Sequence, residues 1–154
     1  MSEKDTISLV NNILKEYIEK NHLRKTPERF AILEEIYSNK LGHFSIDSLY
    51  VFMKEKNFRV TKTTLYNAME IFLDAGLVVK HKFGENKFIF EKIYKRYQHD
   101  HLICVKCGNI IEFCDPSIYE IENKIKKEYD FSIDYHSLYY YGICSKCKKR
   151  KEVK

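Results

Sequence analysis

The chain has 154 residues, of which 44% are hydrophobic, and its formal net charge is +5. This length suits one compact domain or two small ones, and the composition is ordinary for a folded globular protein. A charge this small does not by itself indicate nucleic-acid binding, and no run of about 18 apolar residues predicts a membrane span. We therefore expect a cytoplasmic protein with no signal peptide and no membrane partner.

The first part of the chain is predicted to be helical. Apolar residues recur at helical spacing from Ile7 to Ile18, which indicates an amphipathic first helix. A basic linker with Arg24 and Lys25 follows, and the Thr26-Pro27 pair is typical of the first turn of a second helix.

Two further helices form a predicted helix-turn-helix. Ser45 can cap a third helix, and after a short turn at Asn57 to Val60 a fourth helix starts at Thr61. The N-terminal end of such a fourth helix meets base edges in DNA-binding proteins of this arrangement. Four polar or aromatic residues lie there, off the apolar stripe: Lys62, Thr63, Tyr66 and Asn67.

A β-hairpin is predicted to complete the first domain. Leu77 to Lys82 and Lys87 to Glu91 read as strands joined by a short turn at residues 83–86, as in the wing of a winged helix. We therefore predict a winged-helix DNA-binding domain at 1–92, a polar hinge at 93–97 and a second domain at 98–154.

The second domain is predicted to be a small α/β unit, which makes the fold class α+β. Strands are expected at Asp100 to Cys104, at Asn109 to Phe113 and over the long aromatic stretch from Phe131 to Tyr141. A helix opens at the Asp115-Pro116 pair, and the basic tail from Lys146 to Lys154 is expected to be a solvated end. The predicted buried face of that helix is Ile118, Ile121, Ile125 and Tyr129.

Four cysteines have the spacing of a tetrahedral zinc site. They form two Cys-x-x-Cys pairs, Cys104 with Cys107 and Cys144 with Cys147. Disulfides are the alternative, but thiols stay reduced in the cytoplasm, which favours metal. Four thiolates leave no position for a substrate, so this zinc is expected to be structural. The fifth cysteine, Cys114, is interpreted as a packing residue.

A second group of candidate ligands surrounds the segment before Cys104. His99 and His101 are one residue apart on a predicted strand and so point to the same face. They need further ligands, and the candidates at element ends are Glu91, Glu112 and His43. A lone histidine such as His43 is more often a surface or capping residue, so the spacing alone leaves this set open.

The whole chain resembles the ferric uptake regulator family of metal-dependent transcription repressors. The most specific matches are His99-Asp100-His101-Leu102-Ile103-Cys104, Cys107-Gly108 and Ile111-Glu112-Phe113. Supporting matches include His43 ahead of Ser45, Thr64-Leu65-Tyr66, Asp74-Ala75-Gly76-Leu77, Phe90-Glu91 and His136-Ser137-Leu138-Tyr139.

The resemblance implies a homodimeric repressor of double-stranded DNA with a palindromic operator. It implies a regulatory metal, and nitrogen and carboxylate ligands suit iron(II), manganese(II) or zinc(II). Glutamates at Glu91 and Glu112 favour iron(II), because peroxide-sensing relatives typically carry aspartate there. The implied regulatory ligands are His43, Glu91, His99, His101 and Glu112. The expected DNA contacts are Arg24, Lys25, Lys62, Thr63, Thr64, Tyr66 and Asn67.

The sequence departs from the family pattern at two places. A third metal site of some relatives would use Asp100 and His136, but Gln98 and Tyr119 stand where histidine and glutamate would complete it. The family often has arginine where this chain has Asn67, and asparagine pairs bidentately with adenine rather than guanine.

Several other functions stay open at this point. Within the family, the alternatives are a peroxide-sensing, zinc-responsive or manganese-responsive member. Outside it, the alternatives are a metalloenzyme and a metal-storage or zinc-scaffold protein. An enzyme would need open coordination at the histidine-rich site, and the sequence carries no nucleophile motif or phosphate-binding loop.

Overall fold

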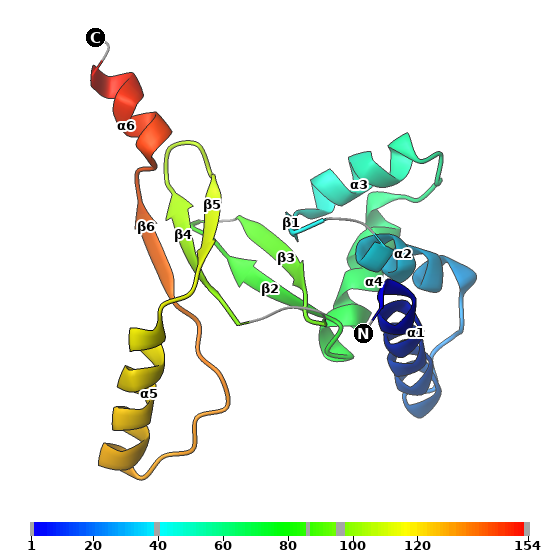
Figure 1. The fold of residues 1–154 in the computed structure, drawn as a ribbon. Helices are drawn as coiled ribbons and strands as arrows, with labels where there is room; N and C mark the ends of the chain where they lie inside the picture. Colours follow the sequence, from blue (N-terminus) through cyan, green and yellow to red (C-terminus); the bar gives the residue numbers. More distant parts are fainter. Residues whose placement is uncertain (1, 39–40, 86, 95–97, 153–154) are drawn as a thin grey trace. The chain divides into compact units, whose positions relative to one another are not determined.

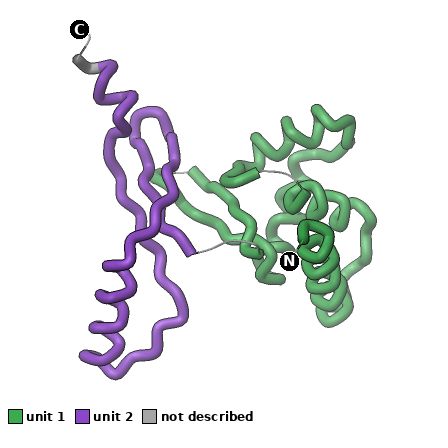
Figure 2. Tube along the Cα trace, viewed as in Figure 1, with its two compact units in different colours: residues 1–96 green, residues 97–154 purple. Residues whose placement is uncertain are grey.

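The computed structural model describes residues 2–38, 41–85, 87–94 and 98–152. The chain divides into two compact units, residues 1–96 and 97–154 (Figure 2). Of the hinge expected at 93–97, residues 95–97 lie outside the described residues. Within the described ranges, no helix is both long and apolar enough to cross a membrane.

Among its described residues, unit 1 has four helices (Figure 1): α1 (Glu3–Lys20), α2 (Pro27–Ser38), α3 (Ile46–Glu55) and α4 (Lys62–Asp74). Every one of them was predicted from apolar periodicity. Their apolar faces meet in one core, because only that packing removes all four stripes from water. The fully buried members include Val10, Leu14, Ile32, Leu33, Ile36, Leu49, Met53, Leu65 and Phe72.

Side-chain caps fix the helix-turn-helix. The Ser45 hydroxyl accepts the Ser48 N–H at 3.1 Å, while the Ser48 hydroxyl oxygen accepts the Ser45 N–H at 2.8 Å. The Thr61 hydroxyl accepts the Thr64 N–H at 3.1 Å and starts α4. Between the two helices Asn57 has a φ of 59°, a left-handed conformation that asparagine tolerates better than most residues.

The sheet of unit 1 has three strands, one more than the sequence predicts. β2 (Val78–Lys82) and β3 (Phe88–Lys92) form the expected hairpin, whose turn includes residue 86 outside the described residues. β1 (His43–Phe44) pairs antiparallel with the other edge of β3, so the order is β1-β3-β2. Two residues carry no period-2 pattern, which is why β1 is invisible in the sequence.

The two faces of this sheet have different chemistry. Phe44 and Phe90 are register partners, stack at 6.0 Å between ring centroids and belong to the helical core. Successive strand residues point to opposite faces, so their neighbours His43 and Glu91 lie on the face away from that core. The wing therefore carries a polar face directly behind an apolar one.

In its described part, residues 98–152, unit 2 contains a second three-stranded sheet and two helices: β4 (Asp100–Cys104), β5 (Ile110–Phe113), α5 (Pro116–Tyr129), β6 (Tyr139–Gly142) and α6 (Ser145–Glu152). The strand order is β5-β4-β6, with β5 antiparallel and β6 parallel to β4. Together the two units confirm the predicted α+β class, a winged helix-turn-helix followed by a small α/β unit.

One expectation for the end of the chain is wrong. Of the strand expected at Phe131 to Tyr141, only the end forms a strand, and β6 begins at Tyr139. The reason is that Tyr139 is the register partner of His101, and β4 begins only one residue before His101. Earlier residues in the stretch therefore have no strand to pair with, whatever their alternation. The basic tail forms a helix, α6 (Ser145–Glu152), and its described basic residues Lys146, Lys148, Lys149 and Arg150 are exposed, as expected of a solvated end; residues 153–154 lie outside the described residues.

The helix α5 begins where the sequence predicts, after its cap Asp115, but it does not have the predicted burial. No residue of α5 is buried in the single chain. Ile121 is 58% exposed and Tyr129 is 68% exposed, although both lie on the apolar face of the helix. The periodicity predicted the helix correctly, but it cannot say whether the partner surface comes from the same chain.

Candidate functional site

The four paired cysteines come from three places in unit 2. Cys104 ends β4, Cys107 lies in the turn that follows, and Cys144 and Cys147 flank the start of α6. Gly108 has a φ of +74° and donates its N–H to the Cys104 carbonyl at 2.9 Å, which closes that turn. Parallel pairing of β4 with β6 brings the second pair alongside the first.

The thiol geometry fits a tetrahedral zinc ion. All four Sγ atoms lie within 4.8 Å of one another, and Cys107 Sγ is 3.7 Å from Cys144 Sγ. Zinc–sulfur bonds of about 2.3 Å in a tetrahedron separate the sulfurs by about 3.8 Å. The cysteines are free thiols and not disulfides. The predicted four-cysteine cluster is thus brought together in a closed, zinc-type site.

Backbone amides prepare part of this cluster for metal. The Cys144 N–H, 3.3 Å from Cys104 Sγ, and then the Cys107 N–H lower the pKa of the Cys104 thiol to about 6. Cys147 is different, because its contact with Cys144 and its burial raise the pKa of its thiol to about 12. A coordinating divalent cation deprotonates such thiols outright, so zinc is what allows all four to be thiolates.

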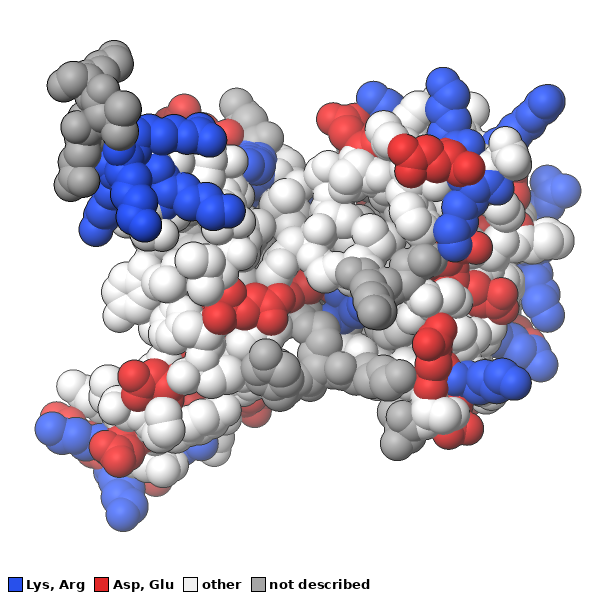
Figure 3. Space-filling view, turned by 45° about the horizontal axis from the view of Figure 1, so that its top comes forward, with Lys and Arg blue, Asp and Glu red and all other residues white. Residues whose placement is uncertain are grey.

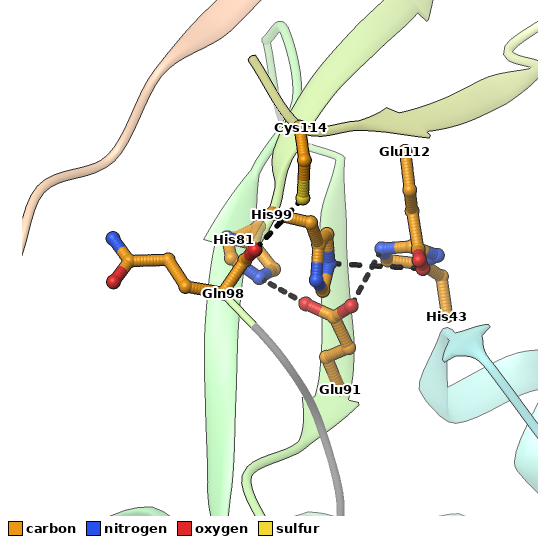
Figure 4. A network of polar contacts seen from close by, with 7 residues as sticks. All are labelled: His43, His81, Glu91, Gln98, His99, Glu112 and Cys114. Carbon is orange, nitrogen blue, oxygen red and sulfur yellow. Dashed lines mark hydrogen bonds and ion pairs between the residues drawn. The ribbon is translucent and has the colours of Figure 1, made fainter. Parts of the chain in front are cut away.

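A cluster of one carboxylate and two imidazoles lies on the polar face of the unit 1 sheet. Glu91 Oε1 is 2.9 Å from His43 Nε2, and Glu91 Oε2 is 2.7 Å from His81 Nε2 (Figure 4). The β1–β3 register places His43 directly opposite Glu91. His43 and Glu91 were predicted as ligands, whereas His81 was missed. Its signal was its position on the strand that pairs with the Glu91 strand, two residues after Val79, the register partner of Glu91.

A matching cluster lies in unit 2. His99 immediately precedes β4 and His101 lies in it, with ring centroids 4.8 Å apart. Glu112 is the register partner of His101 on β5, and its Oε1 lies 3.7 Å from His99 Nε2 (Figure 4). Three of the five expected regulatory ligands therefore gather in unit 2, and the other two gather in unit 1. Imidazole and carboxylate donors of this kind suit first-row divalent metals.

The remaining candidate ligands form a clamp around one imidazole. His136 Nε2 is 2.9 Å from Asp100 Oδ1, and His136 Nδ1 is 3.4 Å from Glu122 Oε2 and 3.0 Å from Gln98 Nε2. The predicted pair of Asp100 and His136 does meet, and Glu122 of α5 joins it unpredicted. Each carboxylate faces a different ring nitrogen, so the three side chains do not converge on one cation position. The hydrogen bond and positive charge of Lys126, and then the contact with His136, keep the pKa of the Glu122 carboxyl below its usual value.

Cys114 does not behave as the packing residue that was expected. It is exposed, and its thiol donates to the Gln98 carbonyl at 3.0 Å (Figure 4). This contact ties the end of β5 to the segment before β4. Cys114 is not among the four sulfurs of the zinc-type cluster.

The expected DNA contacts on α4 are exposed, with one exception. Lys62, Thr63, Tyr66 and Asn67 face solvent. Thr64 is half-buried, and its hydroxyl oxygen lies 3.0 Å from that of Thr61 in the helix cap. Lys62 Nζ is 2.9 Å from Asp47 Oδ1, a contact that raises the pKa of the Lys62 ammonium.

Other basic side chains accompany this helix. Arg24 and Lys25 are exposed before α2. A surface hollow of about 740 Å³ beside the start of α4 is lined in part by Lys54 and Arg59, which the sequence did not single out. Figure 3 shows lysine and arginine side chains mixed with acidic ones over unit 1, and a denser basic group over α6.

Comparisons with known proteins agree with this architecture. Residues 20–141 match the model of the ferric uptake regulator family. The ferric uptake regulation protein of Neisseria meningitidis is 33% identical over 140 residues, which are 91% of this chain and 95% of that protein. The crystal structure of the Vibrio cholerae ferric uptake regulator is 33% identical, covers 84% of this chain and 98% of that one, and superposes with a TM-score of 0.72.

A third comparison adds a metal. The ferric uptake regulator of Pseudomonas aeruginosa, whose structure was solved with manganese, is 30% identical with a TM-score of 0.72, over 85% of this chain and 97% of that one. The similarity thus extends over both units and over most of each chain. This chain belongs to the ferric uptake regulator family of metal-responsive regulators.

Proposed function

We propose that this protein is an iron(II)-sensing repressor that acts as a homodimer on a palindromic DNA operator. The observation that carries the proposal is the division of the five expected ligands between the two units. His43 and Glu91 belong to the wing sheet of unit 1, and His99, His101 and Glu112 belong to unit 2. A cation that uses all five must hold the two units in one relative orientation.

The coordination numbers support a shared metal. Two donors from unit 1 or three from unit 2 leave iron(II) or manganese(II) well short of a filled coordination shell, whereas five donors together nearly complete one. The metal then acts as an allosteric ligand, because it binds the arrangement with both donor sets assembled more tightly than any other. When bound, it supplies charge and geometry but no reaction chemistry.

The effector is assigned from ligand type and from relatives. Mixed imidazole and carboxylate donors accept iron(II), manganese(II) or zinc(II), and the Pseudomonas aeruginosa relative was solved with manganese. The curated relatives are named for ferric uptake regulation, and glutamates rather than aspartates occupy positions 91 and 112. Iron(II) is therefore our proposal, with manganese(II), zinc(II) and peroxide sensing as the alternatives.

The proposed DNA contacts follow from the helix-turn-helix. We propose that Lys62, at the exposed N-terminus of α4, contacts phosphates and that Asn67 contacts base edges in the major groove. The crystal structure of the Vibrio cholerae regulator reveals a rearrangement of its DNA-binding domains, and a DNA-binding domain is the role that we propose for unit 1. A palindromic operator requires two recognition helices related by a two-fold axis, and hence a homodimer.

The exposed apolar face of α5 supports dimerisation through unit 2. A homodimer interface buries the same patch of both copies, and α5 offers such a patch in Ile121, Ile125 and Tyr129. The four thiols also need a reducing compartment to remain metal ligands, so we place the protein in the cytoplasm.

We propose no enzymatic activity. A catalytic metal needs an open coordination position, and five converging protein ligands leave little room for a substrate. Metal-dependent operator binding without turnover of model esters distinguishes a regulator from a metalloenzyme. A metal-storage or scaffold protein would show no sequence-specific DNA binding at all.

The test is an anaerobic titration of operator affinity. Duplexes selected from a random pool in the presence of iron(II) supply the operator, and affinity is measured against iron(II), manganese(II) and zinc(II). We expect a metal-dependent gain of roughly 5-fold to 150-fold, with iron(II) effective at its cellular concentrations. An operator affinity that no metal changes contradicts the proposal.

A further inference from the structure

We infer that His81 is a positioning residue for the regulatory metal: it holds one oxygen of Glu91 and thereby directs the other toward the cation. This inference rests on the proposed function. His81 lies on β2 and Glu91 on β3, where Val79 is the register partner of Glu91. His81 is therefore the diagonal neighbour of Glu91 on the same face of the sheet.

The carboxylate of Glu91 is divided between two imidazoles. Oε1 is 2.9 Å from His43 Nε2, and Oε2 is 2.7 Å from His81 Nε2. Glu91 is on the central strand of the β1-β3-β2 sheet, so one histidine reaches it from each side. Figure 4 shows the two imidazoles on opposite sides of the carboxylate. Because His43 is an expected ligand, we infer that Oε1 faces the metal and that Oε2 does not.

The ring of His81 is itself held in place. It stacks on Phe83 with ring centroids 5.3 Å apart and an interplanar angle of 8°. Phe83 is buried, and it also contacts the His43 ring, with centroids 6.4 Å apart. A flat aromatic contact fixes the plane of the imidazole, so the direction of its Nε2–H bond is set before any metal binds.

The two histidines would have different roles when a metal binds. His43 is an expected ligand, whereas His81 would donate a hydrogen bond from Nε2 to Oε2, since an ionised carboxylate only accepts. Hydrogen bonds of this kind to a ligating carboxylate typically change metal affinity by about 10-fold to 100-fold.

The experiment compares two substitutions of similar length at one position. Glutamine places its amide near the position of Nε2 and can donate to Oε2, whereas methionine cannot. Manganese(II) affinity is measured from the electron paramagnetic resonance signal of the free ion. We expect His81→Met to weaken manganese(II) binding by about 10-fold to 100-fold and His81→Gln to stay within about threefold of the wild type.

A double-substitution cycle with Glu91→Gln shows whether His81 acts through Glu91. If it does, His81→Met adds little once Glu91→Gln is present, because the carboxylate that it positions is gone. A purely structural role predicts instead that the two losses add. Should His81→Met lower the melting temperature or the zinc content, His81→Asn, polar but too short to reach Oε2, replaces it in the cycle.

The outcomes separate this inference from the proposed function. If Glu91→Gln leaves manganese(II) affinity unchanged, the proposed metal site itself is wrong. If Glu91→Gln weakens binding but His81→Met and His81→Asn do not, only the role of His81 is overturned. Equal losses in His81→Gln and His81→Met also overturn it, since they make His81 a direct ligand.

Discussion

Glu91 lies directly across the sheet from His43, and its Oε1 is 2.9 Å from His43 Nε2. The pairing gives His43 a defined place on β1, where the sequence alone placed it in a linker. It also removes the alternative that His43 caps α3, because Ser45 is the cap and forms the capping box with Ser48. What remains is an imidazole on the polar face of the wing sheet beside a carboxylate.

Replacing His43 should therefore affect the metal response more than stability. We expect His43→Ala to keep the zinc, the dimer and the fold, but to lose most of the metal-dependent gain in operator affinity, about 1 to 3 kcal/mol. The matched control is Ser45→Ala, which should lower stability by about 0.5 to 2 kcal/mol and leave the metal response unchanged. The measurement is operator affinity with and without iron(II), together with thermal unfolding, which separates a lost metal response from a loss of stability. An intact response in His43→Ala would remove this residue from the metal site.

Removing one ligand of the zinc-type cluster should disrupt unit 2 as a whole. Cys104 ends β4, and its partners Cys144 and Cys147 flank the start of α6. In the described part of unit 2 the buried hydrophobic residues are Ile103, Cys104 and Cys147, so the metal would link elements that have little other buried core. We expect Cys104→Ser to lose zinc, native near-ultraviolet dichroism and dimerisation together. Cys114→Ser is the control and should keep one zinc per chain. A dimeric, zinc-free Cys104→Ser protein with a native spectrum would show that the cluster is dispensable.

Asn67 should determine base preference and not overall affinity. It is exposed on α4 one residue after Tyr66, and asparagine pairs with the N6 and N7 positions of adenine. We expect Asn67→Ala to lower discrimination at one operator position by about 1 to 3 kcal/mol. Selection of operators from random duplexes by both proteins provides the measurement. Identical preferences at every position would mean that Asn67 does not reach the bases.

Lys62 should instead act on all sequences alike. Its ammonium already lies 2.9 Å from Asp47 Oδ1, so a phosphate has to compete with this carboxylate. We expect Lys62→Ala to weaken every duplex and to reduce the slope of log affinity against log salt by about 1. Asp47→Asn should have the opposite effect on affinity and salt slope, because it removes the carboxylate that competes with phosphate for Lys62. Lys126→Ala in unit 2 should change neither the affinity nor the salt slope. A Lys62→Ala protein with the wild-type salt slope would exclude a phosphate contact.

The sequence predicted those parts that carry a local signal. Helix caps and apolar periodicity located α1 to α4, and Cys-x-x-Cys spacing identified the four thiols that the structure brings within 4.8 Å. The strand positions of His101 and Glu112 also followed from local pattern, and they are register partners.

The missed parts depend on pairing between distant residues. β1 is two residues long, and it is a strand only because it pairs with the edge of β3 that β2 does not occupy. The role inferred for His81 depends on Glu91, its diagonal neighbour in another strand. β6 is short because β4, with which it pairs, begins at Asp100. None of these properties belongs to one segment, so no window of sequence contains them.

The exposed face of α5 leads to the last prediction. No residue of this helix is buried in the single chain, yet Ile118, Ile121 and Ile125 recur at the spacing of a buried stripe. A second copy of unit 2 would cover the same stripe in both chains. Burying one isoleucine contributes about 1.5 to 3 kcal/mol, and a two-fold interface counts it twice.

We therefore expect Ile121→Asp to raise the dimer dissociation constant by at least about 100-fold, since two carboxylates would also be desolvated. The monomer should keep its fold and its zinc, because Ile121 is already 58% exposed. Asn123→Asp, on the opposite side of the same helix, introduces the same charge and should leave the dimer unchanged. Sedimentation equilibrium at several concentrations measures the dissociation constant, and circular dichroism with zinc analysis checks the fold. An Ile121→Asp protein that dimerises as tightly as the wild type would place the interface on another surface of unit 2.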